Sequence, residues 1–215
     1  MPELNTIQLL IVIAPPLLLA ITLHEVAHGW MALRCGDTTA RSLGRLSLNP
    51  IRHIDPVGTL LVPGLLAVFG GFIFGWAKPV PVSYHRLHQP KRDMALVALA
   101  GPGSNLVMAI GWVIIMAISL ALQHQAAWLG RPLLLMGIYG VNINIMLGVL
   151  NMLPIPPLDG SKVLAGFLPD RVGQIMTQIE PYGLIVLLML LAVGLFDVLM
   201  PVVVAIRSFL LSPFF

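Results

Sequence analysis

The sequence His-Glu-Val-Ala-His occupies residues 24–28, within the apolar stretch Ile7–Leu33. This stretch is long enough to cross the hydrocarbon core of a bilayer as one helix, which takes about 20 residues. Ionisable side chains inside a membrane helix are unfavourable, and by default they mark a functional site. The feature therefore predicts a membrane-spanning helix that carries polar chemistry.

The composition is also that of a membrane protein. Of the 215 residues, 58% are hydrophobic and 10% are charged, whereas roughly a quarter of the residues in a soluble domain are charged. The net charge of +3 is explained by the Lys and Arg residues that gather in cytoplasmic loops of membrane proteins. No motif for nucleic acid accompanies this charge, so we expect no nucleic-acid partner. The single cysteine, Cys35, excludes an intrachain disulfide and a cysteine-based zinc site.

Five apolar stretches approach the length of a membrane-spanning helix: Ile7–Leu33, Val57–Ala77, Met94–Leu122, Pro132–Leu153 and Leu184–Ile206. They predict an all-α polytopic membrane protein that folds as a helix bundle in the lipid bilayer. The chain has no room for a second large domain. We therefore expect a single domain over residues 1–215, with its core at 7–168 and a C-terminal transmembrane segment at about 184–206.

Two segments are predicted to depart from straight membrane helices. The stretch Val57–Ala77 carries Pro63 and five glycines, a composition that disfavours a straight helix. Because broken segments occur in membranes where protein or water shelters the backbone, we predict that Val57–Ala77 is re-entrant or forms a hairpin. Over residues 39–50, polar and apolar residues alternate, which favours a short β-hairpin at the membrane surface.

His24, Glu25 and His28 have the spacing of a zinc site. On a helix, residues i and i+4 lie on one face about one turn apart, so two imidazoles there can bind one zinc ion. A glutamate that follows the first ligand can act on water as a general base. The alternative is that the three residues only pack and hydrogen-bond within a helix bundle, but this is unfavourable inside a membrane.

A catalytic zinc ion commonly takes three protein ligands and a water, so a third ligand is needed. The candidate is Asp159 in NMLPIPPLDGSK at 151–162, where the prolines are expected to end the fourth helix near Leu153. Aspartate is also a common N-cap, here of a helix that starts at Gly160. Spacing alone leaves the ligand and the N-cap roles of Asp159 equally open.

The topology of the chain is tied to this site. His24 and His28 lie toward the C-terminal end of the first stretch, and Asp159 follows the fourth. One zinc ion can bind all three only if these two ends lie at the same side of the membrane. A returning Val57–Ala77 meets this condition, and it leaves Arg131 alone among the loop basic residues on the opposite side, as the positive-inside rule favours.

HEVAHGW at 24–30 and NMLPIPPLDG at 151–160 together resemble the two metal motifs of the site-2 protease family of intramembrane zinc metalloproteases. FGWAKPVPV at 74–82 and LAGPGSN at 99–105 also resemble compact members of that family. The resemblance covers about residues 21–168 and implies a form without a PDZ or CBS domain. It further implies a multi-pass protein of a prokaryotic cytoplasmic membrane.

The resemblance implies an intramembrane zinc endopeptidase that cuts membrane-spanning protein substrates within or near their transmembrane segments. Carried over residue by residue, it implies one Zn²⁺ per chain, bound by His24, His28 and Asp159, with Glu25 as the catalytic base. Asn151 matches the asparagine that opens the second motif, and is expected to hold the substrate backbone or polarise its carbonyl group.

Two further points qualify this interpretation. Asn105 and Asn144 are polar residues in apolar stretches, and helix–helix hydrogen bonding is their expected role. The competing class of function is a metal-binding membrane protein without proteolysis, such as a transporter or a pseudoprotease scaffold. An intact Glu25 argues against a pseudoprotease, and the lack of an inverted repeat argues against a transporter.

Overall fold

The computed structural model describes residues 4–62, 65, 75–123 and 125–214, which form helices and loops with no strand among them. The long helices are α1 (Thr6–Arg34), α4 (Pro90–Leu122), α5 (Ala127–Asn151), α7 (Asp170–Ala192) and α8 (Leu195–Leu211). The short ones are α2 (Thr39–Ser42), α6 (Asp159–Phe167), and the turns η1 (Pro50–His53), η2 (Pro56–Leu61) and η3 (Tyr84–Arg86).

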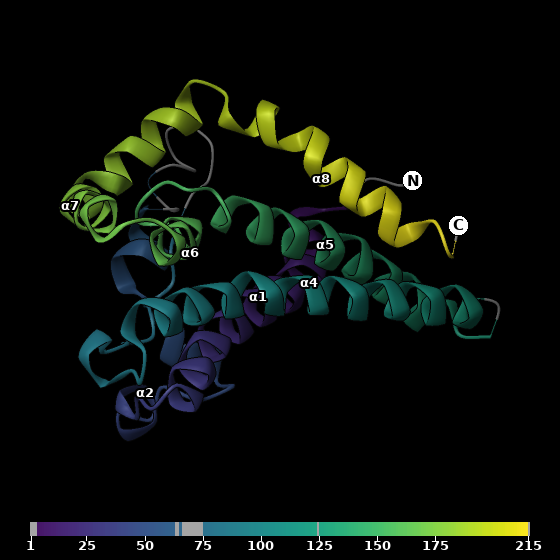
Figure 1. Ribbon diagram of the computed structural model, residues 1–215. Helices are drawn as coiled ribbons and strands as arrows, with labels where there is room; N and C mark the ends of the chain where they lie inside the picture. Colours follow the sequence, from purple (N-terminus) through teal and green to yellow (C-terminus); the bar gives the residue numbers. More distant parts are fainter. Residues whose placement is uncertain (1–3, 63–64, 66–74, 124, 215) are drawn as a thin grey trace.

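Three helices are long and apolar enough to cross a membrane: α1, α4 and α5. A fourth span is formed if the two parts of α7, bent by 52° relative to each other, are taken together. The prediction of an all-α polytopic membrane protein is thus confirmed. Figure 1 shows α1, α4, α5 and α8 side by side, with α2, α6 and α7 gathered at one end of the bundle.

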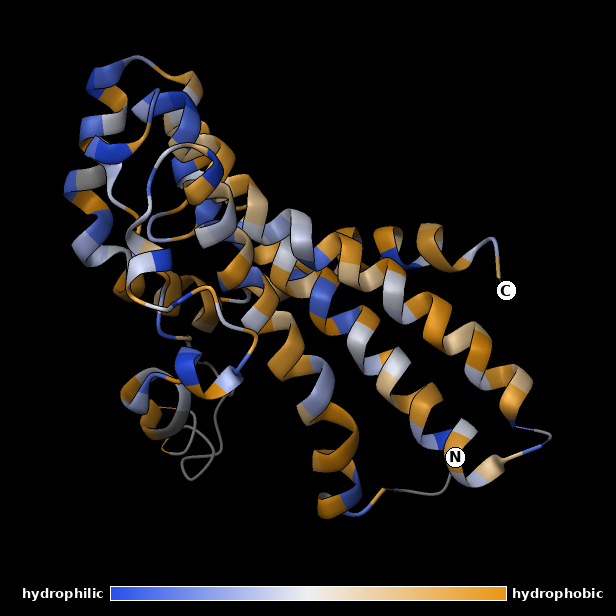
Figure 2. Cartoon of the chain, turned by 90° about the horizontal axis from the view of Figure 1, so that it is seen from below, coloured by the Kyte–Doolittle hydropathy of each residue, from blue (hydrophilic) through white to orange (hydrophobic). Residues whose placement is uncertain are grey.

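The bundle is held together by the close packing of α4 and α5. Its buried core includes Trp112 and Met116 of α4, and Val141 of α5. A Cβ atom at Gly137 would meet the Met116 side chain, and one at Gly140 would meet the Trp112 ring. Small residues allow such close approach between membrane helices. The outward faces of the long helices are mainly apolar (Figure 2), as lipid contact requires.

The predicted β-hairpin at 39–50 is wrong, because this segment contains α2 and leads into η1. The Asp37 carboxylate accepts a hydrogen bond from the backbone N–H of Thr39 at 2.9 Å, and the Asn49 side chain accepts one from Ile51 N–H at 3.1 Å. Such local side-chain bonds to the backbone compete with strand pairing. Alternating polarity alone did not reveal them.

The two ends of Val57–Ala77 lie next to each other, as a re-entrant or hairpin segment requires. The backbone N–H of Trp76 donates to the Gly58 carbonyl at 3.0 Å, and the Thr59 hydroxyl donates to the Trp76 carbonyl at 2.8 Å. The chain therefore returns to the place where this segment began. Residues 63–64 and 66–74, which include Pro63, lie outside the described part of the chain.

The apolar stretch Leu184–Ile206 is divided between two helices rather than forming the single predicted transmembrane segment. Helix α7 ends at Ala192, and α8 begins at Leu195. Between them, Gly194 has a φ of +102°, a left-handed conformation that glycine adopts readily. Continuous hydropathy conceals this turn, because Val193 and Gly194 are themselves apolar or small.

Candidate metal centre and active site

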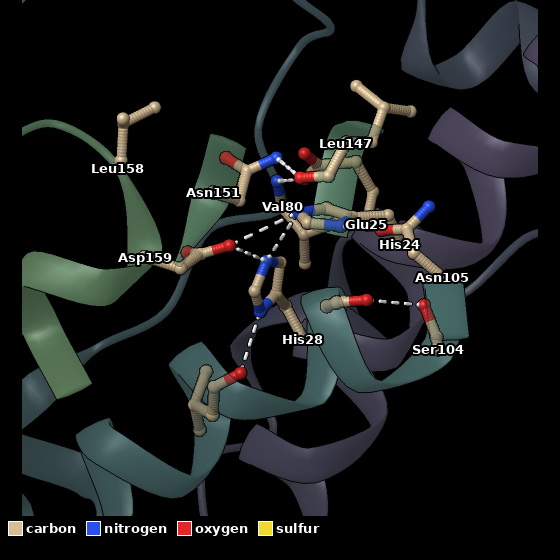
Figure 3. A network of polar contacts seen from close by, with 12 residues as sticks. His24, Glu25, His28, Val80, Ser104, Asn105, Leu147, Asn151, Leu158 and Asp159 are labelled. Atoms are coloured by element: carbon tan, nitrogen blue, oxygen red, sulfur yellow. Dashed lines mark hydrogen bonds and ion pairs between the residues drawn. The ribbon is translucent and has the colours of Figure 1, made fainter. Parts of the chain in front are cut away.

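The metal-binding motif of the sequence is brought together with Asp159 at one end of the bundle. His24 and His28, both buried, lie one turn apart on α1, and their Nε2 atoms are 3.0 Å apart. The Oδ2 atom of Asp159 lies 3.2 Å from each of these two nitrogen atoms. These three side chains converge on one point (Figure 3). They are the one group of three or more metal-ligating side chains in the described residues.

Asp159 reaches the histidines because α6 folds back against α4 after the proline-rich loop. Helix α6 begins at Asp159 itself, with Leu158 as N-cap and no side-chain cap hydrogen bond. The N-cap alternative for Asp159 is therefore wrong, and its carboxylate is directed toward α1. A Cβ atom at Gly160 would meet the carbonyl groups of Met152 and Leu153, so the tight turn requires the glycine that follows Asp159.

The hydrogen bonds behind the two rings determine where their protons lie. His24 Nδ1 is 2.6 Å from Asn105 Oδ1, and His28 Nδ1 is 2.7 Å from the carbonyl oxygen of Val97. A carbonyl oxygen accepts hydrogen bonds and cannot donate them. Each Nδ1 therefore carries the hydrogen, and each Nε2 of a neutral ring presents a lone pair to the centre.

With both rings neutral, as metal ligation requires, the centre is an assembly of electron-pair donors with no proton between them. Two bare Nε2 atoms and the Asp159 carboxylate face one another, and Asp159 Oδ2 is buried without a hydrogen-bond donor. Such an arrangement is unfavourable unless a cation binds it. Ligand atoms 2.0–2.1 Å from a tetrahedral zinc ion lie about 3.3 Å apart, close to the separations observed here. The residues present therefore fit Zn²⁺ in geometry and in chemistry.

Glu25 lies beside this centre but outside the group of three ligand atoms. Its Oε2 atom accepts a hydrogen bond from the backbone N–H of Val80 at 2.7 Å. The residues around Val80 run between Trp76 and Ser83 without regular structure, and they pack on α1 where Gly29 leaves room for the Val80 side chain. A hydrogen bond to one carboxylate oxygen holds the group in place.

Asn151, the last residue of α5, is also next to the centre (Figure 3). Its amide donates one hydrogen bond to the Leu147 carbonyl at 2.9 Å. An amide NH₂ group has two hydrogens, so within the described part of the chain Asn151 keeps a second donor and its oxygen for another partner.

Two contributions to the site were missed in the sequence. Asn105 forms helix–helix hydrogen bonds, as expected. One of them is to His24, so Asn105 also takes part in the site, which the sequence did not indicate. Gly101 packs against both rings: a Cβ atom there would meet the His28 ring and lie 2.7 Å from Cε1 of His24. The available signal was LAGPGSN itself, where small residues and a buried amide interrupt an apolar helix.

Comparison with known proteins points to one family. The model of peptidase family M50 matches residues 114–194. The chain is 38% identical over 200 residues to YwhC of Bacillus subtilis, which covers 92% of this chain and 88% of the relative. It is 31% identical over 192 residues to Rip2 of Mycolicibacterium smegmatis, covering 87% and 69%.

Both relatives are named as zinc metalloproteases. No solved structure matches the chain. The family model, the identity with YwhC over nearly the whole of both chains, and a centre that fits zinc agree with one another. The chain belongs to peptidase family M50, the site-2 protease family, and is an integral-membrane zinc metalloendopeptidase with Zn²⁺ as its cofactor.

Proposed function

We propose that this enzyme hydrolyses peptide bonds within or near the transmembrane segments of membrane-protein substrates, in a prokaryotic cytoplasmic membrane. The observation that carries the proposal is the position of the centre along α1. His24 and His28 precede the end of the helix at Arg34, so they lie about 15 and 9 Å along the axis from that end. If α1 leaves the membrane near Arg34, a substrate must bring its peptide bond to the centre from within the membrane.

In this proposal, His24, His28 and Asp159 bind the zinc ion. Zinc in such a site supplies Lewis acidity and makes water more acidic. Glu25 takes a proton from the attacking water and later returns one to the leaving amine. The hydrogen bond from Val80 N–H to Glu25 Oε2 keeps the carboxylate oriented. The other carboxylate oxygen is then free to accept the proton from water.

Asn151 is proposed to bind the substrate. Its unused amide hydrogen and its oxygen match the C=O and N–H groups of an extended peptide backbone. A substrate helix satisfies its own backbone groups, so it must unwind locally before it can be cut. We further propose that one domain, residues 1–215 with a core at 7–168, carries the whole activity, since α1, α4, α5 and α6 together build the centre.

The test is cleavage of a single-span membrane protein by the purified chain in liposomes. Glu25→Gln should retain zinc and lose activity by about 10²–10⁴-fold, the usual contribution of a general base. Glu180→Gln, which changes a glutamate on α7, is the matched control and should cut normally. Mass spectrometry of the products should locate the cut within or beside the apolar segment. Near-normal turnover by Glu25→Gln, or cuts confined to the substrate's soluble part, would refute the proposal.

A further inference from the structure

We propose that Asn144 and Asn105 are positioning residues of the metal centre, and that together they fix the tautomer and orientation of His24. This role rests on the proposed zinc site. The Asn144 amide donates to the Gly140 carbonyl at 2.8 Å, and Asn105 donates to Asn144 Oδ1 at 3.0 Å. His24 Nδ1 then donates to Asn105 Oδ1 at 2.6 Å. Both asparagine side chains are completely buried.

The direction of this chain of hydrogen bonds is set at its far end. The Gly140 carbonyl can only accept, so Asn144 must direct its NH₂ group to Gly140 and its oxygen to Asn105. Asn105 must then direct its NH₂ group to Asn144, and the Ala20 carbonyl, 3.4 Å from the same nitrogen, requires the same orientation. The Asn105 oxygen is left facing His24. A reversed amide would place two donors or two acceptors against each other.

The consequence for His24 is a fixed tautomer. With the hydrogen held on Nδ1, the lone pair of Nε2 is available to the metal, and the ring cannot rotate without breaking a short buried bond. Partners behind a metal-binding histidine act in this way in many metal sites. No hydrogen bond in the described structure joins Asn144 to any of the three proposed ligands, so its hydrogen-bonded link to the metal site runs through Asn105.

Helix α5 also carries a matched control, two residues away. The Asn142 amide donates to the Ile138 carbonyl at 2.8 Å, the same local bond that Asn144 makes with Gly140. However, the Asn142 oxygen faces Arg207 of α8, 3.4 Å away. The two residues share type, helix and local hydrogen bond, and they differ in their connection to His24. A general role in helix packing predicts similar behaviour for both, whereas the positioning role does not.

The experiment measures zinc affinity by chelator competition, using the full chain in detergent. Asn105→Leu and Asn144→Leu should each weaken zinc binding by about 10–100-fold, and Asn142→Leu should change it by less than about twofold. Leucine is similar in size to asparagine and suits an apolar environment. Thermal unfolding checks that each variant is folded, and Asn144→Ala serves as a second variant.

The decisive result is the double variant. If Asn144 acts through Asn105, the double Leu variant binds zinc as well as Asn105→Leu alone, because the two effects do not add. The visible spectrum of bound Co²⁺ should also change in Asn144→Leu and stay unchanged in Asn142→Leu. Wild-type zinc affinity in Asn144→Leu, equal losses in Asn142→Leu, or fully additive effects would overturn the positioning role. A wild-type chain that bound no zinc would instead defeat the metal centre itself.

Discussion

The two faces of α5 carry similar polar residues in different surroundings. Asn144 faces α1 and α4, where the bonds to Asn105 and from Asn105 to His24 are 3.0 and 2.6 Å long. Asn142 faces α8, where Arg207 lies 3.4 Å away. Arg207 is half-buried and borders an open cavity of about 390 Å³ that Ser208 and Ser212 also line.

The comparison distinguishes a polar residue that belongs to a metal site, Asn144, from one that lies beside a partly hydrated charge, Asn142. On the Asn144 face, the amide nitrogens of Asn144 and Asn105 each have an acceptor, whereas Asp159 Oδ2 at the centre is buried and no donor is found for it among the described residues. On the Asn142 face, the contact is long, and the cavity has room for water around the guanidinium. Contact with water lowers the cost of leaving this charge without a close partner. The presence of polar atoms in a membrane helix therefore does not by itself indicate a metal site. A metal site is indicated where several unpaired lone pairs point to one place.

The largest effect is expected from breaking the centre itself. His28→Ala removes one of the three converging donors and should largely abolish zinc retention after purification. Arg207→Leu on α8, next to the Asn142 face of α5, should retain as much zinc as the wild type. Elemental analysis of zinc per chain checks both variants. Undiminished zinc in His28→Ala would show that the metal is held elsewhere.

A smaller effect is expected from crowding the centre at Gly101. Gly101→Ala introduces a Cβ atom against both histidine rings, and such overpacking typically destabilises by about 1–3 kcal/mol. Zinc affinity should fall about tenfold or more, because the rings must move. Gly103→Ala is the matched control on the same helix, since its Cβ atom would meet nothing within 4 Å. Equal zinc affinity in the two variants would mean that the rings adapt without loss.

Replacing Arg207, on the Asn142 side of α5, should leave thermal stability unchanged or raise it slightly. Arg207→Leu removes a charge whose one described protein partner is the distant Asn142 oxygen. Arg207 is half-buried and has only this 3.4 Å contact among the described residues. Because burial of a charge without a close partner is unfavourable, the variant should unfold at the same temperature as the wild type or higher. A clear loss of thermal stability would show that Arg207 has a stronger partner than the structure gives it.

The smallest effect concerns a buried carboxylate outside the membrane helices. Burial acts to raise the pKa of Asp37, but hydrogen bonds from Thr39 and Ser83 outweigh burial and hold the pKa below its usual value. The ionised group therefore stabilises the fold at neutral pH, and this contribution is lost as the pH falls through the folded-state pKa, below the unfolded value of about 3.9. The difference in melting temperature between wild type and Asp37→Asn should be constant above pH 5 and shrink below about pH 4. A difference that did not depend on pH would contradict this assignment.

The sequence predicted what depends on local spacing. The helix repeat of HEVAHGW was sufficient to place His24 and His28 on one face of a helix. Spacing left the role of Asp159 open, and only the resemblance of NMLPIPPLDG to the second metal motif of the family pointed to it as a ligand. Three long apolar stretches became α1, α4 and α5 with boundaries close to those expected. The return of Val57–Ala77 was predicted by requiring one zinc ion to join two helix ends, and its ends do meet.

Features that depend on three-dimensional register were not predictable. The link from Asn144 to His24 needs three helices aligned within a few tenths of an ångström, and no sequence period encodes it. Gly101 is one of 20 glycines, and only its position beside the histidines distinguishes it. The break at Gly194 and the turns at 39–53 depend on backbone angles and local hydrogen bonds, which hydropathy does not report.

We infer that the bare Nε2 atoms of His24 and His28 and the carboxylate of Asp159 bind zinc. X-ray absorption at the zinc edge of the purified wild-type chain tests it most directly. We expect a shell of four nitrogen and oxygen ligands at about 2.0–2.1 Å, with the outer scattering of two imidazole rings. A sulfur ligand at about 2.3 Å, or a shell without imidazole scattering, would contradict it.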